Sequence, residues 1–160
     1  GVQILRGLTG ATVIATDLKA DARARAEANG AVTVGGGERQ VEEIREITGG
    51  RGVDAAFDFV GATPTIATAS AVMAQGGRLS VVGIAGGTHQ FSFVTSPYES
   101  YVTSTYWGSV GELWEVVDMY RAGQIRPEVT RFPMEEALEA YRRLEAGEIS
   151  GRAVVVPNES

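Results

Sequence analysis

The chain has 160 residues, of which 44% are hydrophobic and 21% charged, a composition typical of a single globular domain. It contains no cysteine and one histidine, which excludes disulfides, thiolate zinc sites, cysteine nucleophiles and multi-histidine metal sites. The formal net charge of −6 with scattered basic residues argues against nucleic-acid binding, and no apolar run approaches the roughly 20 residues of a membrane span.

Apolar periodicity predicts alternating helices and strands along the first half of the chain. The chain opens with apolar residues at helical spacing, and short β-prone runs then alternate with stretches that end at glycine. We expect helices over residues 2–8, 21–28, 41–47 and 64–74, and strands over 12–16, 32–34, 53–60 and 79–84.

The alternation loosens after residue 84. We expect a short extended piece over 90–94, a strand over 101–107, a helix over 113–120, a connecting segment over 127–133, a helix over 137–144 and a strand over 153–156. The segment 124–133 is the best candidate for a joint. We therefore divide the chain into a domain of residues 1–133 and a C-terminal helix and strand of residues 134–160.

This order of elements determines the expected fold class. Short apolar strands that alternate with helices form βαβ units, which close right-handed into a parallel sheet with helices on its faces. The continuous apolar run LSVVGI (79–84) is typical of a strand buried on both sides. We predict an α/β fold with a doubly wound parallel sheet.

Asp17 is the first candidate functional residue, because ligands of open parallel sheets bind beyond the carboxyl ends of the strands. Dinucleotide-binding folds place a carboxylate there to accept hydrogen bonds from the adenosine ribose, and a 2′-phosphate would be repelled, so Asp17 favours NAD over NADP. An acid after a strand is equally often a turn or helix-capping residue. A complete G-x-G-x-x-G phosphate loop occurs nowhere in the chain, and we interpret Gly49–Gly52 as a helix stop.

The aromatic residues and the histidine support two interpretations. His89 follows a glycine loop without a partner for catalysis and is interpreted as structural. Tyr101 and Trp114 lie in a strand and an amphipathic helix, where core packing is the ordinary role. Tyr106 and Trp107 differ, because they end a strand on the expected ligand side.

Several segments, taken in order, carry a family resemblance. They are the strand that ends at Asp17, the alanine-rich helix that ends in NGA (29–31), FDFVGA (57–62), GGRLSVVGI (76–84), TSTYWGS (103–109) and AYRRLEAGEISGRAVVVP (140–157). Together they resemble the nucleotide-binding Rossmann domain of medium-chain, zinc-dependent alcohol dehydrogenases, most of all the bacterial secondary-alcohol branch. The resemblance extends through essentially the whole chain.

The resemblance implies a set of cofactor-binding residues: Asp17, Val60, Gly61, Val82, Gly83, Ile84, Tyr106, Trp107 and Arg152. Asp17 would hold the adenosine ribose, residues 60–61 would line the nucleotide cleft, and residues 82–84 would pass beside the nicotinamide and its ribose. The backbone of residues 106–107 would contact the carboxamide, and Arg152 would reach toward the pyrophosphate. Ala22 stands where the family commonly has a basic residue, and Arg23 follows it.

The resemblance also implies which parts of the family's fold lie outside this chain. In the family, the glycine-rich fingerprint and the first, central strand directly precede the segment that residues 1–5 resemble. The zinc ligands and the proton relay lie further upstream, in a catalytic domain toward which residues 134–160 would return. We therefore expect a Rossmann-like fold that lacks its first strand and glycine-rich loop, with no catalytic residue and no metal ligand in this chain.

The resemblance further implies how copies of the chain associate. The family pairs two such domains through an edge strand, and FSFV (Phe91–Val94) alternates as an edge strand does. We expect a cytoplasmic homodimer through this region, with the missing N-terminal part as a further partner and with no nucleic acid or membrane partner.

These observations predict a function with two alternatives. The leading hypothesis is the cofactor-binding portion of an NAD-dependent alcohol dehydrogenase or ketone reductase, which transfers hydride between nicotinamide and a secondary alcohol or ketone and is inactive as an isolated chain. One alternative is a non-catalytic fragment or module that associates with a missing half. The other is a zinc-free, NADPH-dependent quinone reductase of the same superfamily, against which Asp17 argues.

Overall fold

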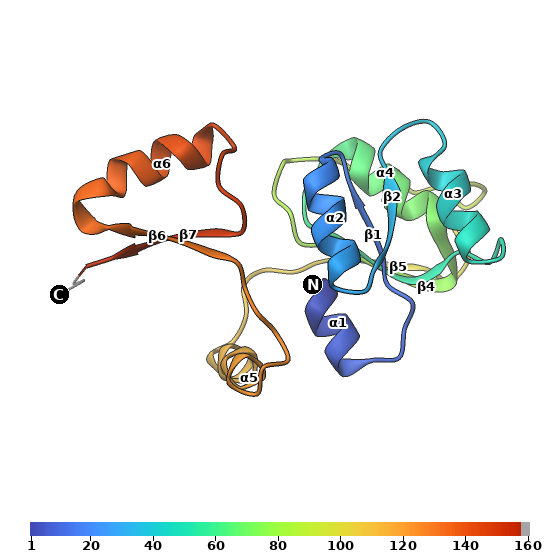
Figure 1. Ribbon diagram of the computed structural model, residues 1–160. Coiled ribbons are helices and arrows are strands. Elements are labelled where there is room, and N and C mark those ends of the chain that lie inside the picture. The colour runs from blue at the N-terminus through green and yellow to red at the C-terminus, as the bar shows by residue number, and fades with distance from the viewer. Residues whose placement is uncertain (158–160) are drawn as a thin grey trace. The chain divides into compact units, whose positions relative to one another are not determined.

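A computed structural model describes residues 1–157 and confirms the α/β class (Figure 1). The helices are α1 (Val2–Leu8), α2 (Ala20–Ala28), α3 (Gln40–Ile47), α4 (Thr63–Val72), α5 (Val110–Arg121) and α6 (Ala137–Glu145), with a short 3₁₀ helix η1 (Met134–Glu136). The strands are β1 (Ile14–Asp17), β2 (Val32–Gly35), β3 (Val53–Asp58), β4 (Met73–Val81), β5 (Tyr101–Ser104), β6 (Val129–Pro133) and β7 (Arg152–Val156). The chain forms two compact units, Gly1–Leu113 and a second one that begins at Trp114.

The strands of the first unit form two parallel sheets. β1 pairs with β2, and β3, β4 and β5 form a second sheet in that order. The classic Rossmann order 3-2-1-4-5-6 places a central strand between two such groups. The pair β2-β1 and the three strands β3-β4-β5 match the two flanks of that order, so the predicted Rossmann-like fold without its first strand is confirmed.

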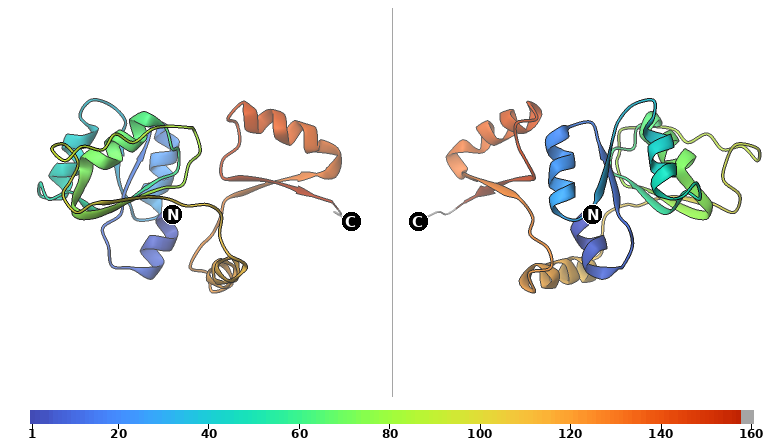
Figure 2. Two further views of the ribbon diagram at one scale, coloured as in Figure 1. Left: turned by 180° about the vertical axis from the view of Figure 1, so that it is seen from behind. Right: turned by 45° about the vertical axis from the view of Figure 1, so that its right-hand side comes forward.

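The core of the first unit lies where α3 and α4 pack against the strands. The two helices lie side by side in both views of Figure 2. Two clusters of buried residues carry this packing; they are Val34, Ile44 and Val72, and Ile66, Met73 and Leu79. Leu79 of β4 is completely buried. These buried side chains pack α3 and α4 against β2 and β4.

The other face of the β3-β4-β5 sheet is open in the first unit. Phe57 of β3 is 48% exposed and Tyr101 of β5 is 56% exposed, and every residue of β5 is exposed. Successive strand residues point to opposite faces, and α4 packs on β3 and β4 from one side. The predicted burial of LSVVGI on both sides is confirmed only for its first half: Leu79 is buried and Ser80 and Val81 are half-buried, whereas Val82 and Ile84 are exposed. The assignment of Tyr101 to the core is wrong for this unit.

Two local predictions differ from the structure. The segment predicted as a connection contains β6, which pairs in parallel with β7. Residues 91–94, predicted as an extended edge strand, form no strand. Instead, the Ser96 amide donates to the Ser92 carbonyl at 2.9 Å and the Ser92 amide donates to the Ser96 hydroxyl at 3.1 Å. These local bonds close a turn, whereas a strand needs backbone hydrogen bonds to a neighbouring strand.

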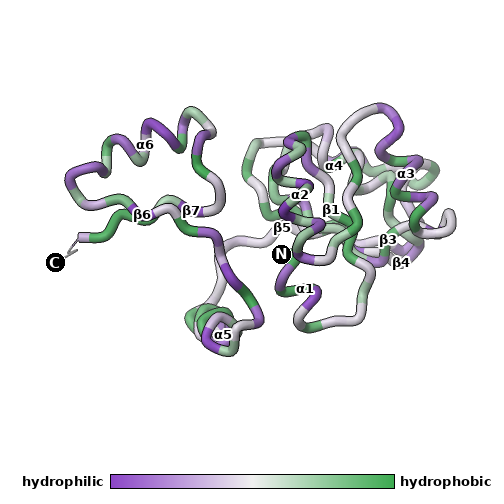
Figure 3. The backbone as a smooth tube through the Cα atoms, viewed as in Figure 1, coloured by the Kyte–Doolittle hydropathy of each residue, from purple (hydrophilic) through white to green (hydrophobic). Residues whose placement is uncertain are grey.

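The second unit contains a small βαβ arrangement in which α6 follows β6 in the chain and precedes β7, and the two strands pair directly in parallel. Phe132 of β6 and Ala140 of α6 are buried against each other's elements. Hydrophobic and hydrophilic residues alternate along α5 and α6 (Figure 3), yet Trp114 of α5 and Tyr141 of α6 are exposed. The assignment of Trp114 to a core is thus wrong for the described residues.

Candidate functional site

Residues predicted to bind a cofactor lie beyond the carboxyl ends of four strands in the first unit. Asp17 ends β1, Val60 and Gly61 follow β3, residues 82–84 follow β4, and residues 106–107 follow β5. In parallel sheets this edge is the one at which ligands bind. The structure therefore places eight of the nine predicted residues at the expected edge. Two of them, Gly61 and Gly83, have no side chain and can contribute only backbone groups.

The segments that follow β3 and β4 contact each other through their backbones. The Val82 and Gly83 amides donate to the Asp58 carbonyl at 2.8 and 3.0 Å, and the Ala85 amide donates to the Val60 carbonyl at 3.2 Å. The Gly87 amide donates to the Gly61 carbonyl at 2.8 Å. The parallel pairing thus continues beyond the strands and brings residues 60–61 and 82–84 together.

Two glycines allow this close approach. Gly61 has a φ of +71°, in the left-handed region that favours glycine. A Cβ atom at Gly61 would overlap the Gly83 carbonyl oxygen, and a Cβ atom at Gly83 would overlap the Val60 carbonyl carbon. Any larger residue at either position would force the two segments apart.

Asp58 lies beneath these segments at the end of β3. It is the one buried charged or polar residue among residues 1–157, with 6% exposure. Its Oδ1 accepts hydrogen bonds from the Val60 amide at 2.9 Å and the Gly61 amide at 3.0 Å, and its Oδ2 accepts one from the Thr65 hydroxyl at 2.7 Å. Sequence reasoning missed Asp58 and Thr65. The available signal is an acid inside the apolar run FDFV, which needs hydrogen-bond partners when buried.

Two exposed side chains near this buried carboxylate, at the carboxyl edge of the sheet, are apolar. Val60 is 52% exposed and Ile84 is 97% exposed. The Val60 carbonyl and the amides of Gly83 and Ala85, on either side of Ile84, form hydrogen bonds between the two segments, which restricts the backbone that carries both side chains. An exposed apolar pair on rigid backbone suits a flat ring of a ligand better than a charged group.

Tyr106 and Trp107 continue from β5 next to the end of β4. The Thr105 amide donates to the Val81 carbonyl at 3.1 Å, which extends the β4-β5 pairing toward them. Their rings contact edge to face with centroids 5.6 Å apart, and both side chains are largely exposed. Trp107 has a φ of +56°, an uncommon conformation for a bulky residue. Such backbone strain is concentrated at functional sites.

Asp17 has an exposed side chain at the end of β1. Its Oδ1 accepts a hydrogen bond from the Lys19 amide at 2.8 Å, the geometry of a turn-stabilising acid. The Arg23 guanidinium donates to the Asp17 carbonyl at 2.7 Å and to the Leu18 carbonyl at 3.0 Å. Arg23 therefore places a positive charge beside Asp17, close to where the related family has its basic residue.

Arg152, the ninth predicted residue, belongs to the second unit. It begins β7, where its amide donates to the Glu128 carbonyl at 3.0 Å. Its guanidinium donates to the Gly151 carbonyl at 3.2 Å. Its role in pyrophosphate binding stays a prediction.

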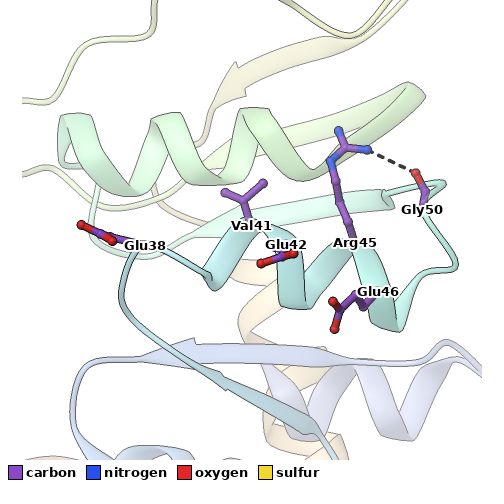
Figure 4. Close-up of a pocket in the computed structure, with 6 residues that line it drawn as sticks. All are labelled: Glu38, Val41, Glu42, Arg45, Glu46 and Gly50. Carbon is purple, nitrogen blue, oxygen red and sulfur yellow. Dashed lines mark hydrogen bonds between the residues drawn. The ribbon is translucent and has the colours of Figure 1, made fainter.

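Other features of the described residues are less suited to a ligand. An open groove on α3 is lined by Glu38, Val41, Glu42, Arg45, Glu46 and Gly50 (Figure 4). Its one cation, Arg45, already donates to the Gly50 carbonyl at 3.2 Å and the Ala71 carbonyl at 2.7 Å. Residues 1–157 contain no group of three or more His, Cys, Asp and Glu side chains that could hold a metal ion. Nor does this part of the chain include a helix with the length and apolar character that a membrane crossing requires.

Comparison with known proteins supports the family resemblance found in the sequence. Residues 1–121 match the family model described as zinc-binding dehydrogenase. An NAD-dependent alcohol dehydrogenase of Sulfurisphaera tokodaii is 32% identical over 98% of this chain and 46% of its own length. The crystal structure of the alcohol dehydrogenase of Aeropyrum pernix superposes with a TM-score of 0.86 at 36% identity and covers 98% of this chain and 46% of that one.

A further relative, a D-arabinose 1-dehydrogenase (NADP(+)) of Saccharolobus solfataricus, is 29% identical over 71% of this chain and 33% of its own length. The chain thus spans about half the length, or less, of the curated relatives that it matches. The chain belongs to the medium-chain, zinc-binding dehydrogenase family and corresponds to its C-terminal, NAD-binding portion.

Proposed function

We propose that this chain is the cofactor-binding portion of an NAD-dependent dehydrogenase that interconverts a secondary alcohol and its ketone. The observation that carries the proposal is the carboxyl edge of the first unit, where an exposed carboxylate follows β1 and a glycine-dependent, backbone-paired rim follows β3 and β4. The relatives with about one third identity are named as NAD-dependent alcohol dehydrogenases.

The residues of this edge divide the cofactor between them. The Asp17 carboxylate, with Oδ1 turned to the Lys19 amide, offers Oδ2 to the hydroxyls of the adenosine ribose. The apolar side chains of Val60 and Ile84 and the backbone of residues 82–83 form the surface for the nicotinamide and its ribose. The strained backbone at Trp107 presents its polar groups to the carboxamide.

The chemistry itself depends on groups beyond these residues. NAD, when bound, supplies the nicotinamide that accepts or donates the hydride. The described residues do not fit the zinc ion of the family, since no cluster of metal-ligating side chains occurs among them. The task of these residues is to bind and orient the cofactor, and we propose that the isolated chain has no dehydrogenase activity. Alcohol-dependent NADH formation by the pure 160-residue chain would contradict this.

Cofactor titration tests the proposal most directly. The full-length gene product should bind NAD in preference to NADP, measured by calorimetry at fixed ionic strength. A preference for NADPH would instead favour the quinone reductase alternative, and the NADP(+)-dependent relative makes this a necessary control. Absence of binding to either cofactor would favour the non-catalytic module.

We also propose that two copies associate through residues 91–94. Phe91, Phe93 and Val94 are 74%, 78% and 83% exposed, which is unusual for three apolar residues so close together. Contact with a second copy would bury them and supply the strand partner that the single chain lacks. Light scattering at micromolar concentration should give a dimer, whereas Phe93→Glu should give a monomer; a monomeric parent protein would contradict the proposal.

The domain limits and the further partner belong to the same proposal. We assign residues 134–160 to a segment that returns toward the N-terminal half of the family's fold. That N-terminal half would be a further partner of residues 1–133. Limited proteolysis of the full-length protein, followed by mass spectrometry, tests this boundary: a first cut near residue 133 supports it, and a first cut near residue 114, where the second compact unit begins, contradicts it. A cytoplasmic location stays a prediction that cell fractionation would test.

A further inference from the structure

We propose that Asp58, acting with Thr65, is a positioning residue that holds the turn Val60–Gly61 in the conformation that faces the cofactor. The inference rests on the proposed function of this edge and adds a residue that neither the family resemblance nor the residue types had indicated.

Every oxygen of the Asp58 carboxylate is directed into the protein. Oδ1 accepts from the amides of Val60 and Gly61, and Oδ2 accepts from the Thr65 hydroxyl at 2.7 Å. With 6% of its surface exposed, Asp58 has no oxygen to offer a ligand. It therefore acts through the residues that it holds and does not contact the cofactor itself.

The turn needs this carboxylate because its two amides have no partner in a strand or helix. β3 ends at Asp58 and α4 begins at Thr63, so the amides of residues 60 and 61 lie between the two ladders. A buried amide without a partner costs about as much as a lost hydrogen bond. The carbonyls of the same two residues accept from Ala85 and Gly87. Val60 and Gly61 are thus each held through both their amide and their carbonyl.

Thr65 links this arrangement to α4. Its single hydroxyl proton has two acceptors in reach, Asp58 Oδ2 at 2.7 Å and the Ala62 carbonyl at 2.9 Å, and its oxygen accepts from the Ala62 amide at 3.2 Å. The first turn of α4 is therefore tied to the same carboxylate as the turn before it. A shift of Asp58 would move the exposed Val60 side chain and the Gly61 backbone together.

The hydrogen-bond pattern predicts which replacement works. An asparagine at position 58 keeps one carbonyl oxygen for the two amides, and its NH₂ group can donate to the Thr65 hydroxyl, which then donates to Ala62 alone. An alanine leaves both amides without their acceptor, and the Thr65 hydroxyl keeps only the Ala62 carbonyl. Asp58→Asn should therefore retain the turn and Asp58→Ala should not.

The test compares NAD with AMP, which carries only the adenosine end, in the full-length gene product. Asp58→Ala should raise the Kd for NAD on the order of 10-fold, because a buried acceptor for three donors is lost. The Kd for AMP should stay within about 2-fold, because AMP binds at Asp17 on the other sheet. Asp58→Asn should restore NAD binding to within about 3-fold of the parent protein. The matched control Asp54→Ala removes an exposed carboxylate from the same strand and should change neither constant.

The outcomes separate this inference from the proposed function. An unchanged Kd for NAD in Asp58→Ala, or an equal loss of AMP binding, would overturn the inference. If Asp58→Ala does not fold, Thr65→Val decides: weaker NAD binding with AMP binding retained supports the inference, and unchanged NAD binding overturns it. A parent protein that binds no NAD would overturn the proposed function, and the inference with it.

Discussion

The two sheets of the first unit hold the carboxyl ends of their strands in different ways. At the end of β1, side chains form the hydrogen bonds that fix the backbone: the Asp17 carboxylate accepts from the Lys19 amide, and the Arg23 guanidinium donates to the carbonyls of residues 17 and 18. At the ends of β3 and β4, backbone meets backbone through Gly61 and Gly83. The conformation at the end of β1 depends on charged side chains that a mutation can replace. The conformation at the ends of β3 and β4 depends on two positions that have no side chain.

This difference predicts how each end tolerates mutation. Exposed side-chain contacts near β1 can change without disturbing a core, so this end is suited to setting cofactor preference. The glycine contacts between the β3 and β4 segments lie directly above Asp58, and a small added volume there displaces main chain. That end is suited to a fixed geometry that should not vary.

Gly83→Ala should have the largest effect. The added Cβ would overlap the Val60 carbonyl carbon, which is main chain and cannot move aside like a side chain. We expect the free energy of unfolding to fall by about 3 kcal/mol or more, with loss of NAD binding. Urea denaturation of the full-length protein checks this. In Gly10→Ala the new Cβ meets no atom within 4 Å, so this control should stay close to the parent protein; similar stability of the two variants would contradict backbone contact.

Asp17→Ser should act on cofactor preference instead of stability. Loss of a charged acceptor for the ribose hydroxyls should weaken NAD binding on the order of 10-fold. NADP should bind more tightly than to the parent protein, because repulsion of its 2′-phosphate is removed while Arg23 stays beside the site. Calorimetric titration with both cofactors measures the ratio. Asp21→Asn, which removes another exposed acid nearby, is the control, and an equal change there would mean that only the net charge matters.

The fold was largely predictable from the sequence because its signals are local. Apolar runs and glycine stops identify strands and helices without knowledge of distant contacts, and β1 to β5 all lie within their predicted segments or overlap them. β6 was missed because the prolines at 127 and 133 suggest a connection, although its last residue, Pro133, needs no amide partner there. The prediction of a strand at 91–94 was wrong because alternating apolar and polar residues indicate only which side chains would share a face. They do not supply a neighbouring strand for the backbone hydrogen bonds.

The site was predictable only in part. The rule that ligands bind at the carboxyl edge led to Asp17 and to residues 106–107 from strand order alone. The need for Gly61 and Gly83 depends on contacts between segments more than twenty residues apart, which only the family resemblance could indicate. Asp58 was missed because its partners are two backbone amides and a hydroxyl on α4, and none of these is visible as a motif.

Trp107→Gly should sharpen the comparison at a third strand end. The residue has a φ of +56°, so glycine should relieve strain and raise the free energy of unfolding by up to about 1 kcal/mol. If the proposed contact with the nicotinamide end of the cofactor is correct, NAD binding should weaken, because the backbone at this position becomes less rigid. Tyr106→Gly is the matched control: with no left-handed φ to relieve, it should lower stability. Thermal unfolding measures both, and a loss of stability in both variants would argue against strain at position 107.

Asp54→Asn should have the smallest effect and tests whether surface charge contributes to the backbone-held sheet. Arg51 donates to both carboxylate oxygens of Asp54 at 2.6 and 2.7 Å and holds the pKa of this carboxyl below its usual value. A depressed pKa stabilises the folded state above the usual carboxyl range, and this contribution disappears as the pH falls through the folded-state pKa. Because the pair is exposed, solvent and salt screen it. The melting temperatures of the parent protein and Asp54→Asn should therefore differ slightly near neutral pH at low salt and converge in acid or in high salt. A difference that persists in acid would mean that Asp54 makes contacts that do not depend on its charge.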